Sequence, residues 1–232
     1  MEPLKRLVKP GKAAKPQGAA YLAPYEVAAR KHGASFEATL WASRTSQMER
    51  FRVIAEMVEM RGRVVVDAGS GCGAMAEYLR DQAIGPARYI GLEGVASVVE
   101  GAKTRDIPGA EVVLADFVAD KSVFARYAPD VVVFSGSLNT VSHRDTLAVL
   151  ERAWEALRTA PCLAQGQAAA LVFNFLSDRC DESLARQDPS PARRFDTMAM
   201  LDWAMDRCTA TRFRQDYLPN GHDATIAMIR RP

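Results

Sequence analysis

The sequence predicts an α/β protein with a doubly wound, mostly parallel seven-stranded sheet, helices on both faces and an antiparallel C-terminal hairpin strand. Short apolar runs alternate with helical stretches, the order that builds parallel strands joined by crossover helices. These runs, such as 131–134, are apolar throughout, as strands covered on both faces are. Two β-like runs around Asn220-Gly221 close the chain and predict the hairpin. A chain of 232 residues can bury a self-sufficient core.

The start of the chain is basic. Residues 1–20 carry five lysines and arginines among prolines and glycines, a composition that buries too little apolar surface to fold. We expect a solvated tail there. The whole chain has a net charge of only +2, which does not favour a nucleic acid partner.

Residues 21–60 predict a helical segment in front of the sheet. A first helix is expected over Tyr21–Gly33, with Pro24 in its first turn, where a missing N–H costs little. A second begins at Ser46, because Ser46 and Glu49 have the S-x-x-E spacing of a capping box. Apolar residues then recur at helical spacing as far as 61–62.

The domain predicted over 61–232 contains the whole sheet. Its best helices are expected at 146–160 and 196–208, and residues 177–195, rich in Arg, Asp, Ser and Pro, predict an inserted loop. The strands are expected near 64–67, 89–92, 112–114, 131–134, 170–173, 212–218 and 225–229.

The run 64–73 predicts a cofactor site. A buried strand ends in Asp67, and the glycines Gly69, Gly71 and Gly73 follow it. Glycines allow the backbone to approach a ligand closely, and Ser70 lies within the same turn. The spacing also satisfies the dinucleotide form G-x-G-x-x-A. Asp67 argues against a pyrophosphate, because its carboxylate would repel phosphate and accept hydrogen bonds from a cationic or hydroxylated ligand.

Two further acids end the next two strands. Glu93, followed by Gly94, stands where a carboxylate can bind both hydroxyls of a ribose. Asp116 and Phe117 offer a carboxylate for an exocyclic amine and an aromatic ring for a purine face. In order along the chain, these residues describe an adenosine-type ligand.

Together these motifs resemble the class I S-adenosylmethionine-dependent methyltransferases, from about Arg61 to the C-terminus. The resemblance implies S-adenosylmethionine as cofactor, with Asp67 near its methionine part, Glu93 on its ribose and Asp116-Phe117 at its adenine. Ser135-Gly136, after the fourth strand, would lie under the methionine and sulfonium. The terminal hairpin is similar to the reversed strand of that fold.

The segments outside the first motif resemble a group of small stand-alone methyltransferases. In that group the N-terminal helices cover the cofactor, so residues 21–60 are expected to act as a lid, together with the loop 177–195. The resemblance makes Trp41, Gln47 and Arg50 candidates for contact with the acceptor or with the methionine carboxylate.

Methyl transfer from a sulfonium needs in-line alignment more than acid–base chemistry. Around the expected methyl position the sequence offers Asn139 and Asn174 to orient an acceptor and His143 to remove its proton, with less weight on His222 and His32. No metal is expected, since only Asp178 lies near the fourth and fifth strand ends and the four cysteines are widely spaced.

We therefore expect a metal-independent methyltransferase that acts on O or N of a small molecule. The sequence leaves open an RNA or protein acceptor, a non-catalytic protein that binds the same cofactor, and, from the glycine turn alone, an NAD(P)-dependent oxidoreductase. The longest apolar runs are too short to span a membrane, and a cytoplasmic location is expected. Neither the acceptor nor the oligomeric state can be predicted from the sequence.

Overall fold

A computed structural model describes residues 19–105 and 107–232. The predicted basic tail lies outside these residues, apart from its last two. The strands of the single sheet follow the order β3-β2-β1-β4-β5-β8-β7, and a short β6 pairs with the end of β5. The strands are β1 Val64–Ala68, β2 Arg88–Glu93, β3 Ala110–Leu114, β4 Val131–Phe134, β5 Ala169–Ser177, β6 Arg194–Phe195, β7 Thr211–Arg214 and β8 Asp223–Arg230.

The predicted α/β class is confirmed. Strands β1 to β5 pair in parallel, whereas β8 runs antiparallel to both β5 and β7. The seven predicted strands are present, and β6, which has two residues, adds an eighth. The helices are α1 Ala23–His32, α2 Arg44–Met57, α3 Ala74–Asp81, α4 Ala96–Lys103, α5 Val123–Tyr127, α6 His143–Ala156, α7 Glu182–Ala185 and α8 Thr197–Met205.

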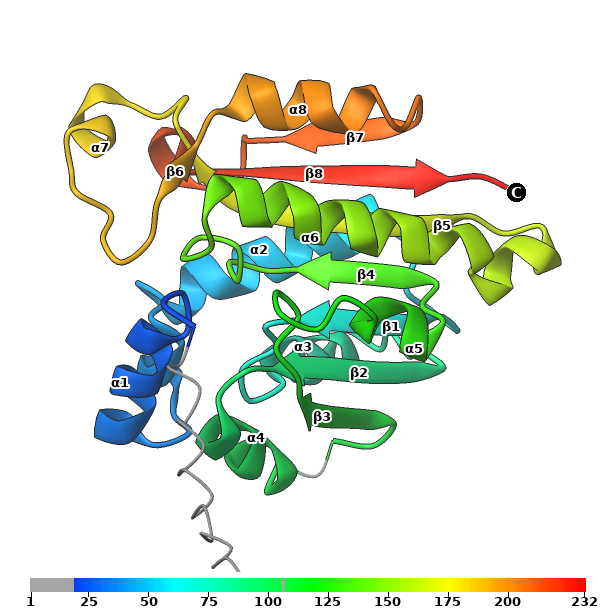
Figure 1. The fold of residues 1–232 in the computed structure, drawn as a ribbon, viewed down its shortest axis with the longest axis horizontal. Coiled ribbons are helices and arrows are strands. Elements are labelled where there is room, and N and C mark those ends of the chain that lie inside the picture. The colour runs from blue at the N-terminus through cyan, green and yellow to red at the C-terminus, as the bar shows by residue number, and fades with distance from the viewer. Residues whose placement is uncertain (1–18, 106) are drawn as a thin grey trace, which may run out of the picture.

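Helices cover both faces of the sheet. In Figure 1, α5 and α6 lie in front of the strands, and α2 and α3 lie behind them. Successive residues of one strand alternate between the two cores: Val66 packs with α6, and its neighbour Val65 packs with α2 and α3. The residues of β4 alternate between the two cores in the same way, which explains why its sequence is apolar at every position.

The strand order reverses between β1 and β4, which are neighbours although β2 and β3 separate them in the chain. At such a reversal the crossover connections leave the sheet in opposite directions, and a crevice opens at the carboxyl ends of the strands. The glycine turn after β1 and the loop after β4 border this crevice. Figure 1 shows α1 lying across the same end of the sheet.

The second predicted helix begins earlier than expected. Ser43, not Ser46, is its N-cap: the Ser43 hydroxyl accepts a hydrogen bond of 3.1 Å from the Ser46 N–H, and α2 starts at Arg44. The capping-box reading of Ser46 and Glu49 was wrong, because Ser43 offers the same cap three residues earlier. The helix also ends at Met57, before the expected 61–62.

The C-terminal hairpin is confirmed, but its turn is longer than expected. Strand β7 ends at Arg214 and β8 begins at Asp223. Asn220 has a φ of 63°, as the Asn-Gly signal implies, but it lies in a short 3-10 turn within the connection 215–222. The Gln215 amide donates to the Gly221 carbonyl oxygen at 3.0 Å and helps to close that connection.

In the part of the chain that the structure describes, no helix has both the length and the apolar character needed to cross a bilayer.

Candidate functional site

A cavity of about 340 Å³ lies at the crevice, between the carboxyl ends of the strands and the N-terminal segment, residues 21–60. This volume is in the range of small-molecule sites. Fourteen of the residues singled out from the sequence line it: Trp41, Gln47, Arg50, Asp67, Gly69, Ser70, Gly71, Glu93, Gly94, Phe117, Ser135, Gly136, Asn139 and His222.

The floor of the cavity is the glycine turn between β1 and α3. Gly69, Gly71 and Gly73 have φ values of 82°, 56° and 81°, in the left-handed region that side chains disfavour. The Gly69 and Ser70 N–H groups donate to the Leu92 carbonyl oxygen at 2.7 and 3.1 Å, which fixes the turn on β2. Gly73 caps α3 and does not line the cavity, so its role is to shape the turn.

Asp67 is a buried carboxylate at the end of β1. The residue is only 2% exposed, and its carboxylate oxygen Oδ2 accepts a hydrogen bond from the Tyr89 hydroxyl. The other oxygen, Oδ1, is buried and has no partner within the described structure. Burial raises the pKa of Asp67 to about 7, although the Tyr89 hydrogen bond opposes this shift. An unpartnered carboxylate oxygen beside a bare backbone turn is suited to a ligand that donates hydrogen bonds.

Glu93 connects the end of β2 to the glycine turn. Its carboxylate accepts hydrogen bonds from the Gly71 N–H at 3.0 Å and the Val95 N–H at 2.8 Å. Burial raises its pKa, although these backbone donors oppose the shift. A carboxylate has about four lone-pair directions, so two backbone donors leave room for further donors from the cavity.

The loop after β4 forms another part of the cavity lining. Gly136 has a φ of 71°, and its N–H donates to the Asn174 Oδ1 at 2.6 Å. Asn174, on β5, is buried and does not line the cavity, so its position does not meet the expectation of contact with an acceptor. It holds the Gly136 turn instead. Ser135 is also buried, and its hydroxyl lacks a partner within the described residues.

Asp116 also lies outside the lining. Its carboxylate caps its own turn through the Val118 and Ala119 N–H groups, both at 3.0 Å, and the Tyr21 hydroxyl donates to it at 2.6 Å. Tyr21 lines the cavity in its place, as Phe117 does. The partner of Asp116 that reaches the cavity therefore comes from the N-terminal segment, which the sequence did not indicate.

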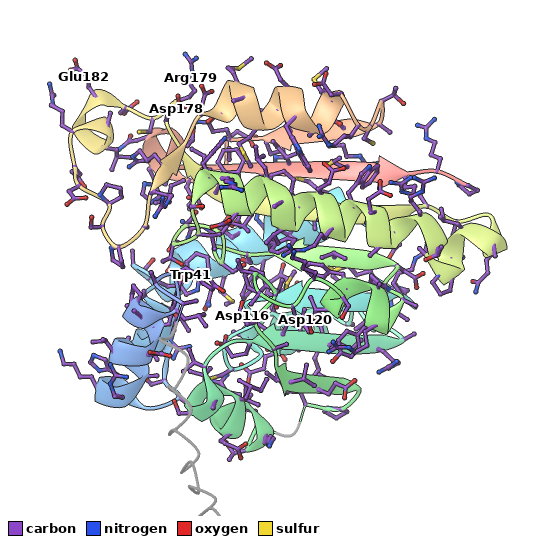
Figure 2. All side chains as sticks on the ribbon, in the orientation of Figure 1. Trp41, Asp116, Asp120, Asp178, Arg179 and Glu182 are labelled. Atoms are coloured by element: carbon purple, nitrogen blue, oxygen red, sulfur yellow. The ribbon has the colours of Figure 1, made fainter. Side chains whose placement is uncertain are left out.

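Three glycines receive side chains of the N-terminal segment. A methyl group at Gly94 would come within 2.8 Å of the Leu22 side chain, and one at Gly136 within 2.7 Å of the Trp41 ring. A methyl group at Gly101, in α4, would overlap the Cβ of Ala34. Figure 2 shows Trp41 where the segment meets the strand ends. These contacts place the segment directly on the sheet domain.

Gly101→Ala is expected to lift the N-terminal segment from α4. Alanine would favour the helix by about 1 kcal/mol, but its methyl group would collide with Ala34, and such overpacking costs about 1–3 kcal/mol. Limited trypsin digestion at Arg30 and Lys31 should then be faster than in the wild type. The double variant Ala34→Gly/Gly101→Ala should restore protection, and Gly85→Ala, where nothing lies within 4 Å, should change nothing. Unchanged digestion of Gly101→Ala would contradict the contact.

Arg50 and Asp223 form a buried ion pair between α2 and β8. Their side chains are 6% and 1% exposed, and the Arg50 guanidinium stacks over Trp41 at 4.4 Å from the ring centroid. The pair neutralises Arg50 within the wall of the cavity. Removing one partner of such a pair leaves a buried charge uncompensated, so the contact helps to fix α2 in place.

The remaining wall is formed by the ends of β4 and β5, the start of β8 and the loop 177–195. Asn139 accepts a hydrogen bond of 3.2 Å from the Leu176 N–H, which leaves its amide group able to donate into the cavity. His222 lines the cavity, and burial lowers its pKa. Within the loop, residues 189–192 line the cavity, whereas Arg179 and Glu182 do not, and Figure 2 shows them at the edge of the molecule, away from Trp41.

His143 does not reach this wall. It is the exposed first residue of α6, because the Ser142 hydroxyl caps that helix through the Asp145 N–H at 3.1 Å. Its ring packs 5.9 Å from the ring of Phe195, outside the cavity lining. The expectation that His143 removes a proton from the acceptor is not met by this position, and His222, given less weight in the sequence, is the histidine in the cavity.

No protein-family model matches the chain, and no curated protein matches it in sequence. Solved structures share its fold. A methyltransferase from Leishmania major aligns at a TM-score of 0.64 and 15% identity, over 90% of this chain and 83% of that one. One from Archaeoglobus fulgidus gives 0.62 and 13%, over 81% and 95%. The DhpI-SAM-HEP complex gives 0.59 and 20%, over 94% and 100%.

The first two structures are described as S-adenosylmethionine-dependent methyltransferases, and the third contains S-adenosylmethionine. The sheet order, the reversed strand β8 and these alignments show that the chain has the fold of the class I S-adenosylmethionine-dependent methyltransferases.

Proposed function

We propose that the protein transfers a methyl group from S-adenosylmethionine to an oxygen or nitrogen of a small molecule, by in-line displacement and without a metal. The observation that carries this proposal is Asp67: a buried carboxylate with one unpartnered oxygen that lines the cavity beside three left-handed glycines. The cofactor supplies an activated methyl group on a sulfonium. The chain has to bind it, align an acceptor and exclude water.

The residues of the cavity fit the parts of this cofactor. The ammonium group of the methionine moiety suits the free Oδ1 of Asp67, since a charge-assisted hydrogen bond would satisfy both groups. Glu93 retains lone pairs for the ribose hydroxyls, and Phe117 and Tyr21 offer flat surfaces for the adenine. In this assignment Asp116 acts through Tyr21, as the acceptor of its hydroxyl hydrogen.

The N-terminal segment acts as the lid of this site, together with residues 189–192. Its close contacts with Gly94, Gly101 and Gly136 hold it against the sheet, with Tyr21 and Trp41 in the lining of the cavity. A covered site excludes water, which keeps the sulfonium from side reactions and strengthens the electrostatic contacts of Asp67. It also favours a small acceptor over a polymer, because the cavity of about 340 Å³ has to hold both cofactor and acceptor.

His222 is the group proposed to receive a proton from the acceptor. Burial holds its pKa below the usual 6.5, so its imidazole is neutral near pH 7 and able to accept a proton. At saturating S-adenosylmethionine the rate should therefore be independent of pH above 6.5 and fall as the pH drops through the lowered pKa of His222, because the protonated ring is no base.

A transfer assay tests this function. Isotope-labelled S-adenosylmethionine is incubated with the protein and, in separate reactions, with small-molecule, RNA and protein fractions of a cell extract. Label is expected in the small-molecule fraction. His222→Gln should lower the rate by about 10²–10⁴, the usual contribution of general-base catalysis, whereas His143→Gln should keep the wild-type rate. Label only in RNA or protein would contradict the acceptor class, and the reverse order of the two variants would restore His143 as the base.

A further inference from the structure

We propose that the acceptor is a small organic acid, whose carboxylate binds Arg44 while a hydroxyl of the same molecule faces His222. This inference rests on the proposed function and adds to it the chemical class of the substrate. It follows from the distribution of charge in the cavity, from the way in which Arg44 is held, and from the donors beside it.

The charged side chains that line the cavity leave one arginine for an anionic acceptor. Among the described residues of the lining, the carboxylates are Asp67 and Glu93, which follow β1 and β2 and are assigned to the cofactor. The lining arginines are Arg44, Arg50 and Arg105. Arg50 is paired with Asp223 and Arg105 with Glu77, so Arg44 is the one left to bind an anion.

Arg44 is an exposed residue that lines the cavity, and the Glu37 carboxylate interacts with it only at a longer range than an ion pair. Arg44 is the first residue of α2, on the same helical face as Gln47 and Phe51, which also line the cavity. Its guanidinium stacks on Phe36, 4.7 Å from the ring centroid. Within residues 19–105 and 107–232 no carboxylate oxygen lies within 4.0 Å of it, in contrast to Arg50, which is paired with Asp223.

This position suits recognition of a carboxylate. A guanidinium offers a planar pair of N–H donors that match the two oxygens of a carboxylate, and stacking on Phe36 leaves its edge available. The Asn139 amide adds a further donor to the lining of the cavity. These two donor groups fit a ligand rich in anionic oxygen.

The body of the ligand would lie against apolar walls. Leu40 and Leu176 line the cavity, together with Pro189 and Pro191 from the loop 177–195. Leu40 is 43% exposed, a large value for leucine, and it has a left-handed φ of 58°. A flat or aliphatic ligand would cover part of this surface.

The transfer step is balanced with the groups named. A lone pair of the acceptor hydroxyl oxygen attacks the methyl carbon, and a new C–O bond forms. The C–S bond breaks, and its electron pair stays on sulfur as the neutral thioether of S-adenosylhomocysteine. The hydroxyl proton passes to the His222 imidazole and then to water. The carboxylate takes no part in bond making and serves to orient the molecule on Arg44.

Three probes with the same ring and different charge test this selection: benzoate, benzamide and benzylamine. Each is titrated calorimetrically into protein saturated with S-adenosylhomocysteine. Benzoate is expected to bind at least tenfold more tightly than benzamide, and benzylamine most weakly. Arg44→Gln should remove the preference for benzoate and keep the affinity for S-adenosylhomocysteine. Arg30→Gln, an exposed arginine of α1 outside the lining, should behave like the wild type.

The outcomes distinguish failure of the proposed function from failure of the acid-acceptor inference. If S-adenosylhomocysteine does not bind, both the proposed function and this inference fail. If it binds but benzoate shows no advantage, or the advantage persists in Arg44→Gln, the proposed function stands and the acid acceptor is overturned. Preferential binding of benzylamine would point to an amine acceptor and would also overturn it.

Discussion

Asp67→Asn is expected to weaken binding of S-adenosylhomocysteine at least 100-fold at pH 8, while the protein without cofactor becomes more stable. The substitution keeps the shape of the side chain and an oxygen that can accept from Tyr89. It replaces the unpartnered Oδ1, however, and removes the negative charge that would meet the cofactor ammonium. Losing one partner of a buried charge-assisted pair costs about 2–5 kcal/mol.

The gain in stability follows from the raised pKa. The folded protein holds the Asp67 proton up to a pH of about 7, whereas an unfolded chain releases it near 3.8. Between these values the folded state binds more protons, so this group makes the cofactor-free protein less stable as the pH rises through the window. Above pH 7 the ionised, buried carboxylate has its full destabilising effect, and asparagine removes that effect.

The same reasoning gives the pH dependence of binding. An ammonium ligand requires the ionised carboxylate, so affinity for S-adenosylhomocysteine should rise by up to about tenfold for each pH unit between 6 and 7 and level off above. Asp67→Asn should abolish this dependence. Urea unfolding and calorimetry at pH 6 and 8 measure both effects.

Asp120→Asn is the matched control. Asp120 hydrogen-bonds Ser122 and Arg126, contacts that hold its pKa below the usual range, and it does not line the cavity. Figure 2 shows it apart from Trp41 and the lid. This variant should bind S-adenosylhomocysteine like the wild type. Tight binding by Asp67→Asn, or an equal loss of affinity in the two variants, would contradict the assignment of Asp67 to the cofactor site.

Gly69→Ala is expected to disrupt the turn and with it the cofactor site. A side chain at a φ of 82° costs about 1–2 kcal/mol, and the added methyl group would overlap the Cβ of Ser137. Ser137 cannot withdraw easily, because its hydroxyl donates to the Ala68 carbonyl oxygen. Overpacking adds about 1–3 kcal/mol, so the free energy of unfolding should fall by roughly 2–5 kcal/mol.

Two comparisons separate strain from collision at Gly69. Gly62 has a similar φ of 68° with nothing within 4 Å of an added methyl group, so Gly62→Ala should cost only the backbone strain of about 1–2 kcal/mol and leave the binding of S-adenosylhomocysteine intact. The double variant Gly69→Ala/Ser137→Gly should recover part of the lost stability. Equal unfolding midpoints for Gly62→Ala and Gly69→Ala would show that the turn tolerates a side chain.

The sheet and the cofactor turn could be predicted because their signals are local. A strand covered on both faces must be apolar at every position, as 131–134 is, and a left-handed turn requires glycine at Gly69, Gly71 and Gly73. The acids Asp67 and Glu93 follow their strands directly, so the topology alone brings them to one edge of the sheet. For these residues, position in the chain determines position in space.

The other walls depend on contacts between distant segments. Tyr21 meets Asp116, Trp41 meets Gly136 and Ala34 meets Gly101, and no periodicity in the sequence encodes these pairs. His143 and His222 illustrate the same limit: a helix cap turns one outward, and pairing of β5 with β8 brings the other to the cavity. The sequence therefore indicated single residues of these walls, such as Trp41 and Asn139, but not the contacts between distant segments that place them.

Calorimetric titration of the wild-type protein with S-adenosylhomocysteine at pH 8 tests whether this cavity binds the cofactor. We expect saturable binding of one molecule per chain that weakens as the pH falls below 7, and no binding of NADH under the same conditions. Absence of any heat with S-adenosylhomocysteine, or binding of NADH in its place, would contradict the assignment of this cavity.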